Sequence, residues 1–360
     1  MKILKSTFFI LLQLLICSLI LESTSHFFLL SSSNPLYRAR RILQYDHFLG
    51  WMQKPNLNTT FENQKIHTDS EGFRISDEKI NLLTNPKILT LGPSSAFGWG
   101  VANKDTYTSV SAKKLNFEHI NASGVGHSIA QGQRIWSKIK KVNPKYVLIA
   151  YGVNDLDKFR FFDSDSLNDK EFFQHEPHAL KIDKLLLPSD SAIVISLVLR
   201  QLSHTFYCDQ LINSPQRVEW PEYEKILSMM TDEMLKAGIK PIIINTPFFL
   251  VHPNPRFKES DILNAYREVN SFAAKGYCKE AHEKLKIAKS LEPFNINQKV
   301  IELNRLLKEF ANKNNLSIVD AHSLLVNQNA KENFYDPVHP SAKGHKLIAD
   351  EIVKLIQEKN

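Results

Sequence analysis

Residues 87–100 read KILTLGPSSAFGWG, and this stretch decides the fold class. Its first half, Ile88 to Leu91, is a short and continuously apolar run, which is typical of a strand buried on both faces. Gly92 and Pro93 end the run, and two serines follow. A buried strand that ends in a glycine turn favours a parallel α/β sheet, in which the loops at the carboxyl ends of the strands carry the functional residues.

The alternation of apolar strands with amphipathic helices continues to the C-terminus. Further strands are predicted at 118–121, 146–151, 242–244 and 316–319, and helices at 106–115, 131–142, 222–237 and from 341 onward. Because such strands are apolar on both sides, helices must cover both faces of the sheet. The sequence therefore predicts an α/β fold with a parallel central sheet in a body that spans 87–360.

Two stretches interrupt this pattern and are interpreted as helical insertions, at about 156–215 and 258–314. The second resembles one tetratricopeptide unit through Ala274, Gly276, Tyr277, Ala281, Leu285, Ala288 and Pro293. A single unit cannot form a stable solenoid, since such repeats stabilise one another by stacking. We expect a helical hairpin that docks on the core; a partner-binding surface is the alternative, and the sequence identifies no protein partner.

The N-terminus has the pattern of an export signal. Lys2 and Lys5 precede an apolar run over 8–21, as a charged segment precedes the hydrophobic segment of a signal sequence. Extended to residue 30, the segment is long enough to span a membrane. We predict that residues 1–30 are a signal anchor that places the body outside the cytoplasm, at the periplasmic side or the cell surface. A signal peptide, with secretion after cleavage, is the alternative.

Residues 31–86 are interpreted as an irregular lead-in to the body.

Charge and motifs argue against a nucleic-acid-binding protein. The net charge is +7, but the lysines are scattered and no nucleic-acid motif accompanies them. No nucleic acid is therefore expected as a partner. The cysteines Cys208 and Cys278 either pair in an oxidising compartment or stay free. No Cys/His cluster has the spacing of metal ligands, so neither a metal nor another cofactor is expected.

The residues with chemistry to offer fall at predicted strand ends. Ser94 follows the first strand, Gly126 lies in the loop after the second, and Asn154 follows the third. Near the C-terminus, Asp336 and His339 lie three residues apart. Acyl transfer requires a nucleophile, an oxyanion hole and a base with its orienting acid. The hydroxyl can serve as the nucleophile, the loop N–H and the amide as the oxyanion hole, and the His and Asp as the base and its orienting acid.

Four blocks in this order resemble the SGNH (GDSL-like) hydrolase family, whose name lists Ser, Gly, Asn and His. The blocks are LGPS with FGWGV at 91–101, INA through QG at 120–132, GVND at 152–155 and DPVHP at 336–340. The resemblance runs from about residue 46 to the end. Its lead-in, with LGW at 49–51, KPN at 54–56 and GFR at 72–74, is similar to bacterial members with an N-terminal anchor.

This resemblance implies a three-layer, flavodoxin-like fold and a role for each matching residue. Ser94 is the implied nucleophile, His339 the base and Asp336 the orienting acid. The implied oxyanion hole uses the N–H groups of Ser94 and Gly126 and the side chain of Asn154. Gly124 is the nearest rival of Gly126 for the donor role.

One residue departs from the family pattern: Pro93 stands where the first block normally has Asp. Proline removes an N–H and a carboxylate that braces the loop, and it leaves the Ser94 hydroxyl untouched. We expect an extracytoplasmic serine esterase that hydrolyses O-acyl esters, including O-acetyl esters, of a carbohydrate or lipid. The alternatives are an O-acetyltransferase acting on a cell-surface polysaccharide and a catalytically degenerate binding protein.

Overall fold

The computed structural model describes most of the chain. The described residues are 2–31, 38–39, 41–75, 87–156, 169, 191, 194–195, 216–249, 264, 267–269, 271–273 and 275–358. The predicted insertion at 156–215 lies almost wholly outside these residues, as does much of the first part of the insertion at 258–314.

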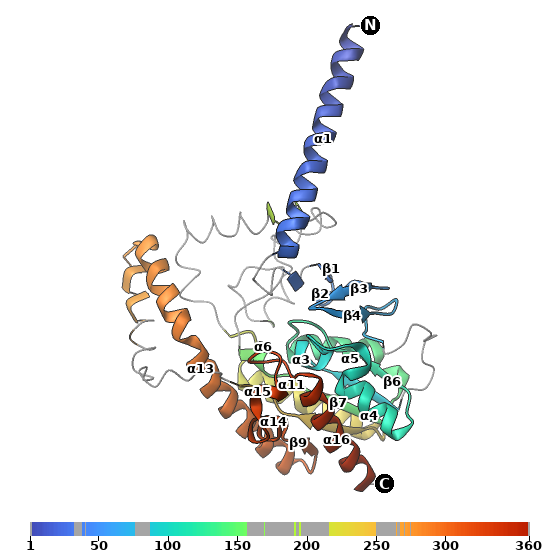
Figure 1. The fold of residues 1–360 in the computed structure, drawn as a ribbon. Helices are drawn as coiled ribbons and strands as arrows, with labels where there is room; N and C mark the ends of the chain where they lie inside the picture. Colours follow the sequence, from blue (N-terminus) through green and yellow to red (C-terminus); the bar gives the residue numbers. More distant parts are fainter. Residues whose placement is uncertain are drawn as a thin grey trace.

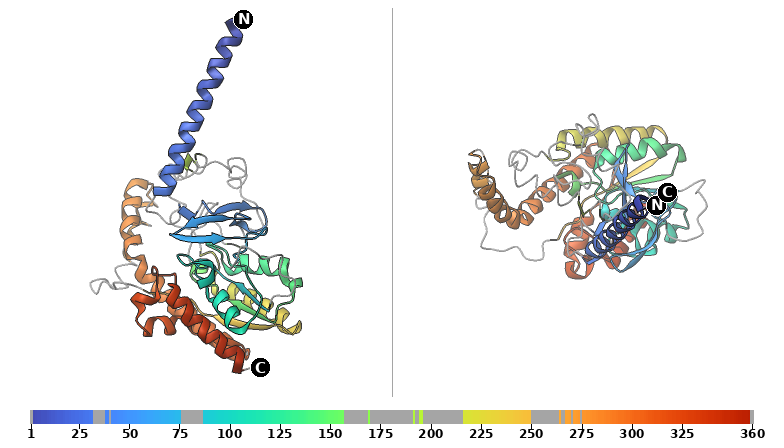
Figure 2. Two further views of the ribbon diagram at one scale, coloured as in Figure 1. Left: turned by 45° about the vertical axis from the view of Figure 1, so that its right-hand side comes forward. Right: turned by 90° about the horizontal axis from the view of Figure 1, so that it is seen from above.

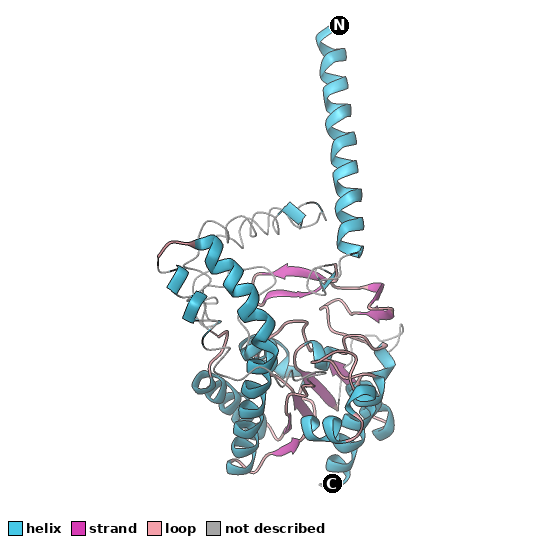
Figure 3. Ribbon diagram, turned by 60° about the vertical axis from the view of Figure 1, so that its left-hand side comes forward, coloured by secondary structure: helices cyan, strands magenta, loops and turns pink. Residues whose placement is uncertain are grey.

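A five-stranded parallel sheet forms the centre of the body (Figures 1 and 3). Its strands are β5 (Ile88–Leu91), β6 (His119–Asn121), β7 (Tyr146–Ile149), β8 (Lys240–Ile244) and β9 (Ser317–Val319). They lie in the order β6-β5-β7-β8-β9, and every neighbouring pair is parallel. In chain order this arrangement is 2-1-3-4-5, the flavodoxin-like order, so the predicted sheet is confirmed.

Helices cover both faces of the sheet. One face packs on α4 (Tyr107–Leu115), α14 (Ala321–Asn327) and α16 (Ala342–Glu358), and the other on α5 (Ile129–Ile139), α11 (Trp220–Lys236) and part of α13 (Cys278–Lys313). Within a strand, alternate residues enter opposite layers: Leu148 packs with the first group of helices, and Val147 and Ile149 pack with the second. The three-layer α/β fold is therefore confirmed.

Several short helices complete the body. They are α3 (Ser94–Phe97), α6 (Val153–Leu156) and α15 (Ala330–Asn333), with 3₁₀ turns η1 (Asn103–Asp105) and η2 (Lys140–Val142). The first two begin directly after β5 and β7, at the carboxyl edge of the sheet.

The described part of the lead-in, 38–39 and 41–75, contains regular structure, so its interpretation as irregular chain is wrong there. It forms two antiparallel hairpins, β1 (Leu43–Asp46) with β2 (Gly50–Gln53) and β3 (Asn58–Phe61) with β4 (Gln64–His67). The second hairpin turns at Glu62 and Asn63, which both have positive φ, as a tight hairpin turn requires. The hairpins bury Trp51, Phe61 and Ile66 against Phe97, Trp99 and Val125 of the body, and Figure 2 shows them between α1 and the sheet.

The N-terminal helix α1 (Lys2–Ser31) leaves the body as a long rod (Figure 1). Within it, Phe9–Phe27 (19 residues) is long and apolar enough to cross a membrane, by length and composition. At 1.5 Å per residue this segment is about 28 Å long, close to the thickness of a bilayer's hydrocarbon core. The same features are shared by signal sequences.

Helix α13 joins the tetratricopeptide-like segment to the core. At its start, Ala281 packs with Ala273, and Leu285 and Ala288 pack with Val269, across a turn in which Gly276 has a φ of 75°. Near its end, Leu303, Leu307, Phe310 and Ala311 lie in the main core beneath the sheet. The helical segment is thus anchored on the body, as a single unit of this kind requires.

Candidate active site

Ser94 lies at the carboxyl end of β5, the strand flanked by β6 and β7 in the sheet. It is the first residue of α3, and Pro93, with φ −86° and ψ −159°, is the N-cap. The first N–H groups of a helix have no partner within the helix. The Ser94 N–H donates no hydrogen bond to any described residue. It is therefore available to a ligand bound beside the Ser94 hydroxyl.

His339 approaches Ser94 from the other end of the chain, 245 positions away. It follows a tight loop that is closed by a bridge between Phe334 and Pro340 and by the hydrogen bond from Tyr335 N to His339 O (2.8 Å). Its Nε2 lies 2.8 Å from Ser94 Oγ, and both residues are almost buried. The structure therefore brings the predicted nucleophile and base into hydrogen-bond contact.

Asp336 holds the other ring nitrogen of His339. Its Oδ2 lies 2.7 Å from Nδ1, and its Oδ1 accepts the N–H groups of Val338 and His339, each at 3.0 Å. Partial burial by itself raises the pKa of Asp336, but the hydrogen bond and charge of His339 and the two backbone N–H groups outweigh burial and lower it. The carboxylate is therefore ionised at neutral pH and able to stabilise an imidazolium.

Aromatic side chains fix the imidazole on its face. The Trp99 ring stacks on His339 with centroids 5.1 Å apart and an interplanar angle of 12°. Phe61, at the end of β3, meets Trp99 edge to face at 4.7 Å. The same hairpin turn supplies Glu62, which accepts the hydroxyl of Tyr335 at 3.0 Å, next to Asp336 in the chain. The second hairpin thus supports the loop that carries Asp336 and His339, the predicted acid and base.

The loop after α3 is braced without an acid at position 93. The buried guanidinium of Arg74 donates to the carbonyl groups of Phe97 (2.7 Å), Gly98 (2.5 Å) and Val101 (2.5 Å). Gly98 has a φ of 91°, and a Cβ there would lie 2.8 Å from Arg74 Nη1, so only glycine fits. From β6, the side chain of Asn121 donates to Ala96 O at 3.0 Å. These contacts hold the loop that would otherwise depend on the carboxylate replaced by Pro93.

Hydrogen bonds in the loop after β6 distinguish the two glycines, Gly124 and Gly126, that could donate to an oxyanion. The N–H of Gly124 donates to Gly92 O at 2.9 Å and is therefore occupied. The N–H of Gly126 has no acceptor among the residues that the structure describes, and Gly126 has a φ of 75°. Of the two, Gly126 is the residue whose N–H is available at the site.

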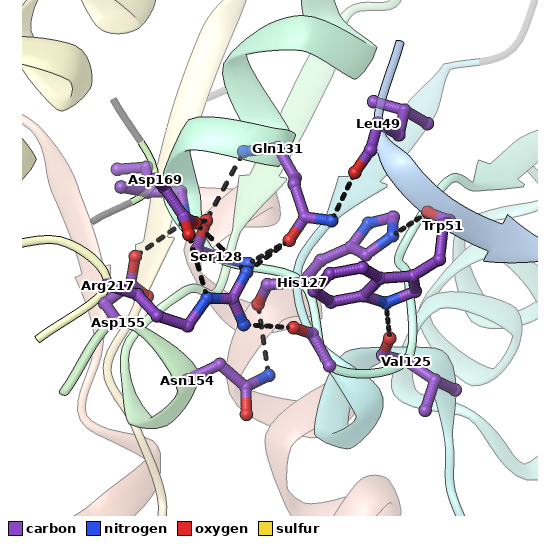
Figure 4. A network of polar contacts seen from close by, with 12 residues as sticks. Leu49, Trp51, Val125, His127, Ser128, Gln131, Asn154, Asp155, Asp169 and Arg217 are labelled. Atoms are coloured by element: carbon purple, nitrogen blue, oxygen red, sulfur yellow. Dashed lines mark hydrogen bonds and ion pairs between the residues drawn. The ribbon is translucent and has the colours of Figure 1, made fainter. Parts of the chain in front are cut away.

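Asn154, in α6 after β7, ties its own loop to the loop that carries Gly126. Its Nδ2 donates to His127 O at 3.1 Å, which leaves the second amide hydrogen for another acceptor (Figure 4). Since β6, β5 and β7 are neighbours in the sheet, Gly126, Ser94 and Asn154 follow three adjacent strands. The structure places all five predicted residues at one edge of the sheet.

A buried polar network behind the Gly126 loop was not predicted from the sequence (Figure 4). Arg217 pairs with Asp169 at 3.0 Å and donates to Gly126 O at 2.5 Å and to Gln131 Oε1 at 2.6 Å. Asp155 accepts the N–H of Ile129 at 2.7 Å, and burial raises the pKa of Asp155 to about 8. The contacts of Arg217 with Gly126 and Gln131 and of Asp155 with Ile129 restrain the loop after β6 and the start of α5.

Comparison with known proteins finds a family model that matches part of the chain. The family model for GDSL-like lipases and acylhydrolases matches residues 191–352, which include Asp336 and His339 but not Ser94. No curated protein matches the sequence.

Solved structures with a similar fold include a GDSL-like lipase from Bacteroides thetaiotaomicron, 14% identical with a TM-score of 0.43, which covers 76% of this chain and 88% of that one. A catalytic mutant of an acetylxylan esterase from Geobacillus stearothermophilus is 14% identical with a TM-score of 0.42 and covers 77% of this chain and 96% of that one. The order of the four blocks and this partial family match make the chain similar to GDSL-like lipases and acylhydrolases, and they support a hydrolase that acts on ester bonds.

Proposed function

We propose that this chain is an extracytoplasmic serine esterase that hydrolyses O-acyl esters of a carbohydrate or a lipid. Ser94 is the proposed nucleophile, His339 the base and Asp336 the orienting acid. The observation that carries the proposal is the continuous hydrogen-bonded series from Asp336 through His339 to Ser94, at 2.7 and 2.8 Å. Three groups in this order activate a hydroxyl that is otherwise a weak nucleophile.

In the first half of the reaction, Ser94 Oγ attacks the ester carbonyl carbon and its proton passes to His339 Nε2. The carbonyl oxygen becomes an oxyanion, which accepts the N–H groups of Ser94 and Gly126 and the free amide hydrogen of Asn154. Asp336 stays ionised and stabilises the imidazolium. His339 then gives its proton to the leaving alkoxide, so the alcohol departs and the acyl group remains on Ser94.

In the second half, water replaces the alcohol. His339 takes a proton from the water as its oxygen attacks the acyl carbon, and the same three donors face the second oxyanion. Collapse of this intermediate returns the proton to Ser94 Oγ and releases the carboxylic acid. The hydrogen bonds from Asp336 to His339 and from His339 to Ser94 support these steps.

The function is tested by p-nitrophenyl acetate hydrolysis in the wild-type chain, Ser94→Ala and Ser95→Ala. We expect Ser94→Ala to lower kcat at least about 1,000-fold, because the triad acts as a unit. Ser95 is buried beside Ser94, and Ser95→Ala is a matched control that keeps activity. Equal turnover by Ser94→Ala would contradict the assignment. Free acid released from an acylated glycan supports hydrolysis, whereas a newly acylated glycan would show transfer instead.

The proposed location outside the cytoplasm has two supports. The segment Phe9–Phe27 has the length and composition to cross a membrane, with Lys2 and Lys5 on its short side. Cys278 is disulfide-bonded, and disulfides persist in oxidising compartments. We propose that α1 anchors the body at the outer side of the cytoplasmic membrane.

Protease treatment of bacterial cells that express the full chain tests this topology. We expect the protease to digest the body once the outer membrane or cell wall is made permeable and while the cytoplasmic membrane is still intact. We also expect the full chain to sediment with the membrane fraction. A chain that is protected until the cytoplasmic membrane is lysed would contradict the proposed orientation. A body released into the soluble fraction, without residues 1–30, would show a cleaved signal instead of an anchor.

A further inference from the structure

The loop that carries Gly126 is buried except at one residue. Within Asn121–Ala130, every residue is buried apart from Gly126, which is partly exposed. A partly exposed glycine in an otherwise buried loop is where a substrate oxygen can reach the backbone. Its direction depends on the peptide that joins Val125 to Gly126, because that peptide contains the N–H group.

The orientation of this peptide is fixed by a residue of the first hairpin. The indole Nε1 of Trp51, in β2, donates to Val125 O at 2.8 Å (Figure 4). The chain has no cis peptide bonds among the described residues, so the Val125 carbonyl and the Gly126 N–H point in opposite directions. By holding the carbonyl, Trp51 turns the N–H away from the hairpin.

Trp51 also holds the residue on the other side of Gly126. Its own carbonyl oxygen lies 2.9 Å from His127 Nε2, and burial lowers the pKa of His127 to about 4. The ring is therefore neutral at pH 7 and donates from Nε2. One residue thus contacts both neighbours of Gly126, through its indole on Val125 and through its carbonyl on His127.

Trp51 is itself rigidly placed. Trp51 is 1% exposed, its backbone pairs with Tyr45 in the hairpin, and the Arg217 guanidinium lies 5.2 Å from its ring centroid. Arg217 donates in turn to Gly126 O at 2.5 Å, which fixes the following peptide. The two peptides that flank the Gly126 Cα are therefore held by two interacting side chains.

We propose that Trp51 is a positioning residue of the oxyanion hole: its indole N–H orients the Val125–Gly126 peptide so that the Gly126 N–H meets the developing oxyanion. This inference rests on the proposed function, since it assigns a role in the same ester hydrolysis. It also gives the first hairpin a part in the chemistry, although the hairpin supplies no catalytic residue.

The test compares Trp51→Phe, which keeps an aromatic ring and loses the N–H, with Trp136→Phe. Trp136 is 2% exposed and donates its own Nε1 to Glu233 Oε2 at 2.8 Å, so the control loses the indole hydrogen bond of another buried tryptophan, away from the loop and to a partly exposed acceptor. We expect Trp51→Phe to lower kcat roughly 10- to 100-fold, as a small misplacement of a catalytic group does. We expect KM to stay the same, because an oxyanion donor acts mainly in the transition state.

A boronic acid provides a second readout. Butylboronic acid forms a tetrahedral adduct on an active serine and mimics the intermediate, so its affinity should fall in parallel with kcat in Trp51→Phe and not in Trp136→Phe. Thermal unfolding of each variant shows whether lost stability explains the result. If Trp51→Phe does not fold, replacement of Trp51 by 3-benzothienylalanine keeps the size of the ring and removes only the N–H.

The outcomes separate this inference from the proposed function. An active wild-type chain with an unchanged kcat in both Trp51 variants would overturn the role of Trp51 and leave the esterase intact. An equal loss of kcat in Trp136→Phe would show a general structural effect and would also overturn it. A wild-type chain without esterase activity, and without serine labelling, would remove the proposed function and this inference together.

Discussion

The imidazole of His339 is restrained at both nitrogens and on one face. Asp336 binds Nδ1, Ser94 binds Nε2, and Trp99 stacks on the ring. Asp336 is in turn fixed by two backbone N–H groups of its own loop. The carboxylate thereby selects the tautomer that carries hydrogen on Nδ1 and leaves Nε2 to accept the Ser94 proton.

This arrangement predicts the effect of Asp336→Asn. The amide keeps the size of the side chain but offers no charge, and its NH₂ group can hold the wrong tautomer of His339. We expect kcat to fall on the order of 100- to 10,000-fold, with little change in KM. The control is Asp350→Asn, which removes a carboxylate that pairs with lysines on the surface. A kcat for Asp336→Asn within about twofold of wild type would argue against Asp336 as the orienting acid.

At the scale of elements, the four residues of α3 are too few to hold themselves in place, because a single turn leaves most of its backbone groups unpaired. The neighbouring elements supply the partners. Arg74 binds three carbonyl groups of the segment from Phe97 to Val101, and burial lowers the pKa of Arg74 to about 9, so it is still charged at pH 7. The loop that carries Ser94, the proposed nucleophile, therefore depends on a residue of the lead-in segment.

Arg74→Leu tests this dependence. It leaves buried carbonyl groups without donors, and we expect the free energy of unfolding to fall by about 3 kcal/mol or more. Arg305→Leu provides the comparison: Arg305 forms ion pairs with Glu302 and Glu309 on an exposed helix face, and its loss should hardly change stability. Urea denaturation of both variants measures the difference. Equal stability of the two variants would contradict the bracing role of Arg74.

The central sheet was predictable from the sequence, and the hairpins were not. The strand over Tyr146–Ile149 is a continuous apolar run, a signal that arises because both of its faces are covered. In contrast, β3 has the sequence NTTF, with a single apolar residue that packs inward. A strand that buries one side chain in four has no periodic pattern to detect, so the lead-in was interpreted as irregular.

The site residues that could be predicted also differ from the others in the sequence signal that they carry. Ser94, Gly126 and Asn154 follow strands whose ends must meet at one edge of the sheet, and His339 lies in a recognisable block. Arg217 and Asp169 act through contacts with residues distant in the chain, and neither lies in a motif. Trp51 stands out in the sequence only through the block at 49–51, and nothing in the sequence shows that its indole reaches Val125.

At the scale of the whole molecule, the site is built by three regions of the chain. The sheet supplies Ser94 and the proposed donor loops, the C-terminal loop supplies the proposed acid and base, and the hairpins contact both. The hairpins lie on the side of the body from which α1 leaves (Figure 2). The segment next to the proposed anchor is therefore part of the hydrolase body, and a truncation that preserves activity must keep the hairpins.

The central claim is that His339 activates Ser94 for attack on an acyl carbon, and mass spectrometry of a covalent adduct tests it most directly. The full chain is treated with a fluorophosphonate, digested with trypsin, and the peptide that spans 88–104 is fragmented so that Ser94 is distinguished from Ser95. The account predicts one adduct, on Ser94 Oγ, that is absent from Ser94→Ala and formed much more slowly in His339→Ala. An adduct on another residue, or equal labelling of Ser94→Ala, would contradict it.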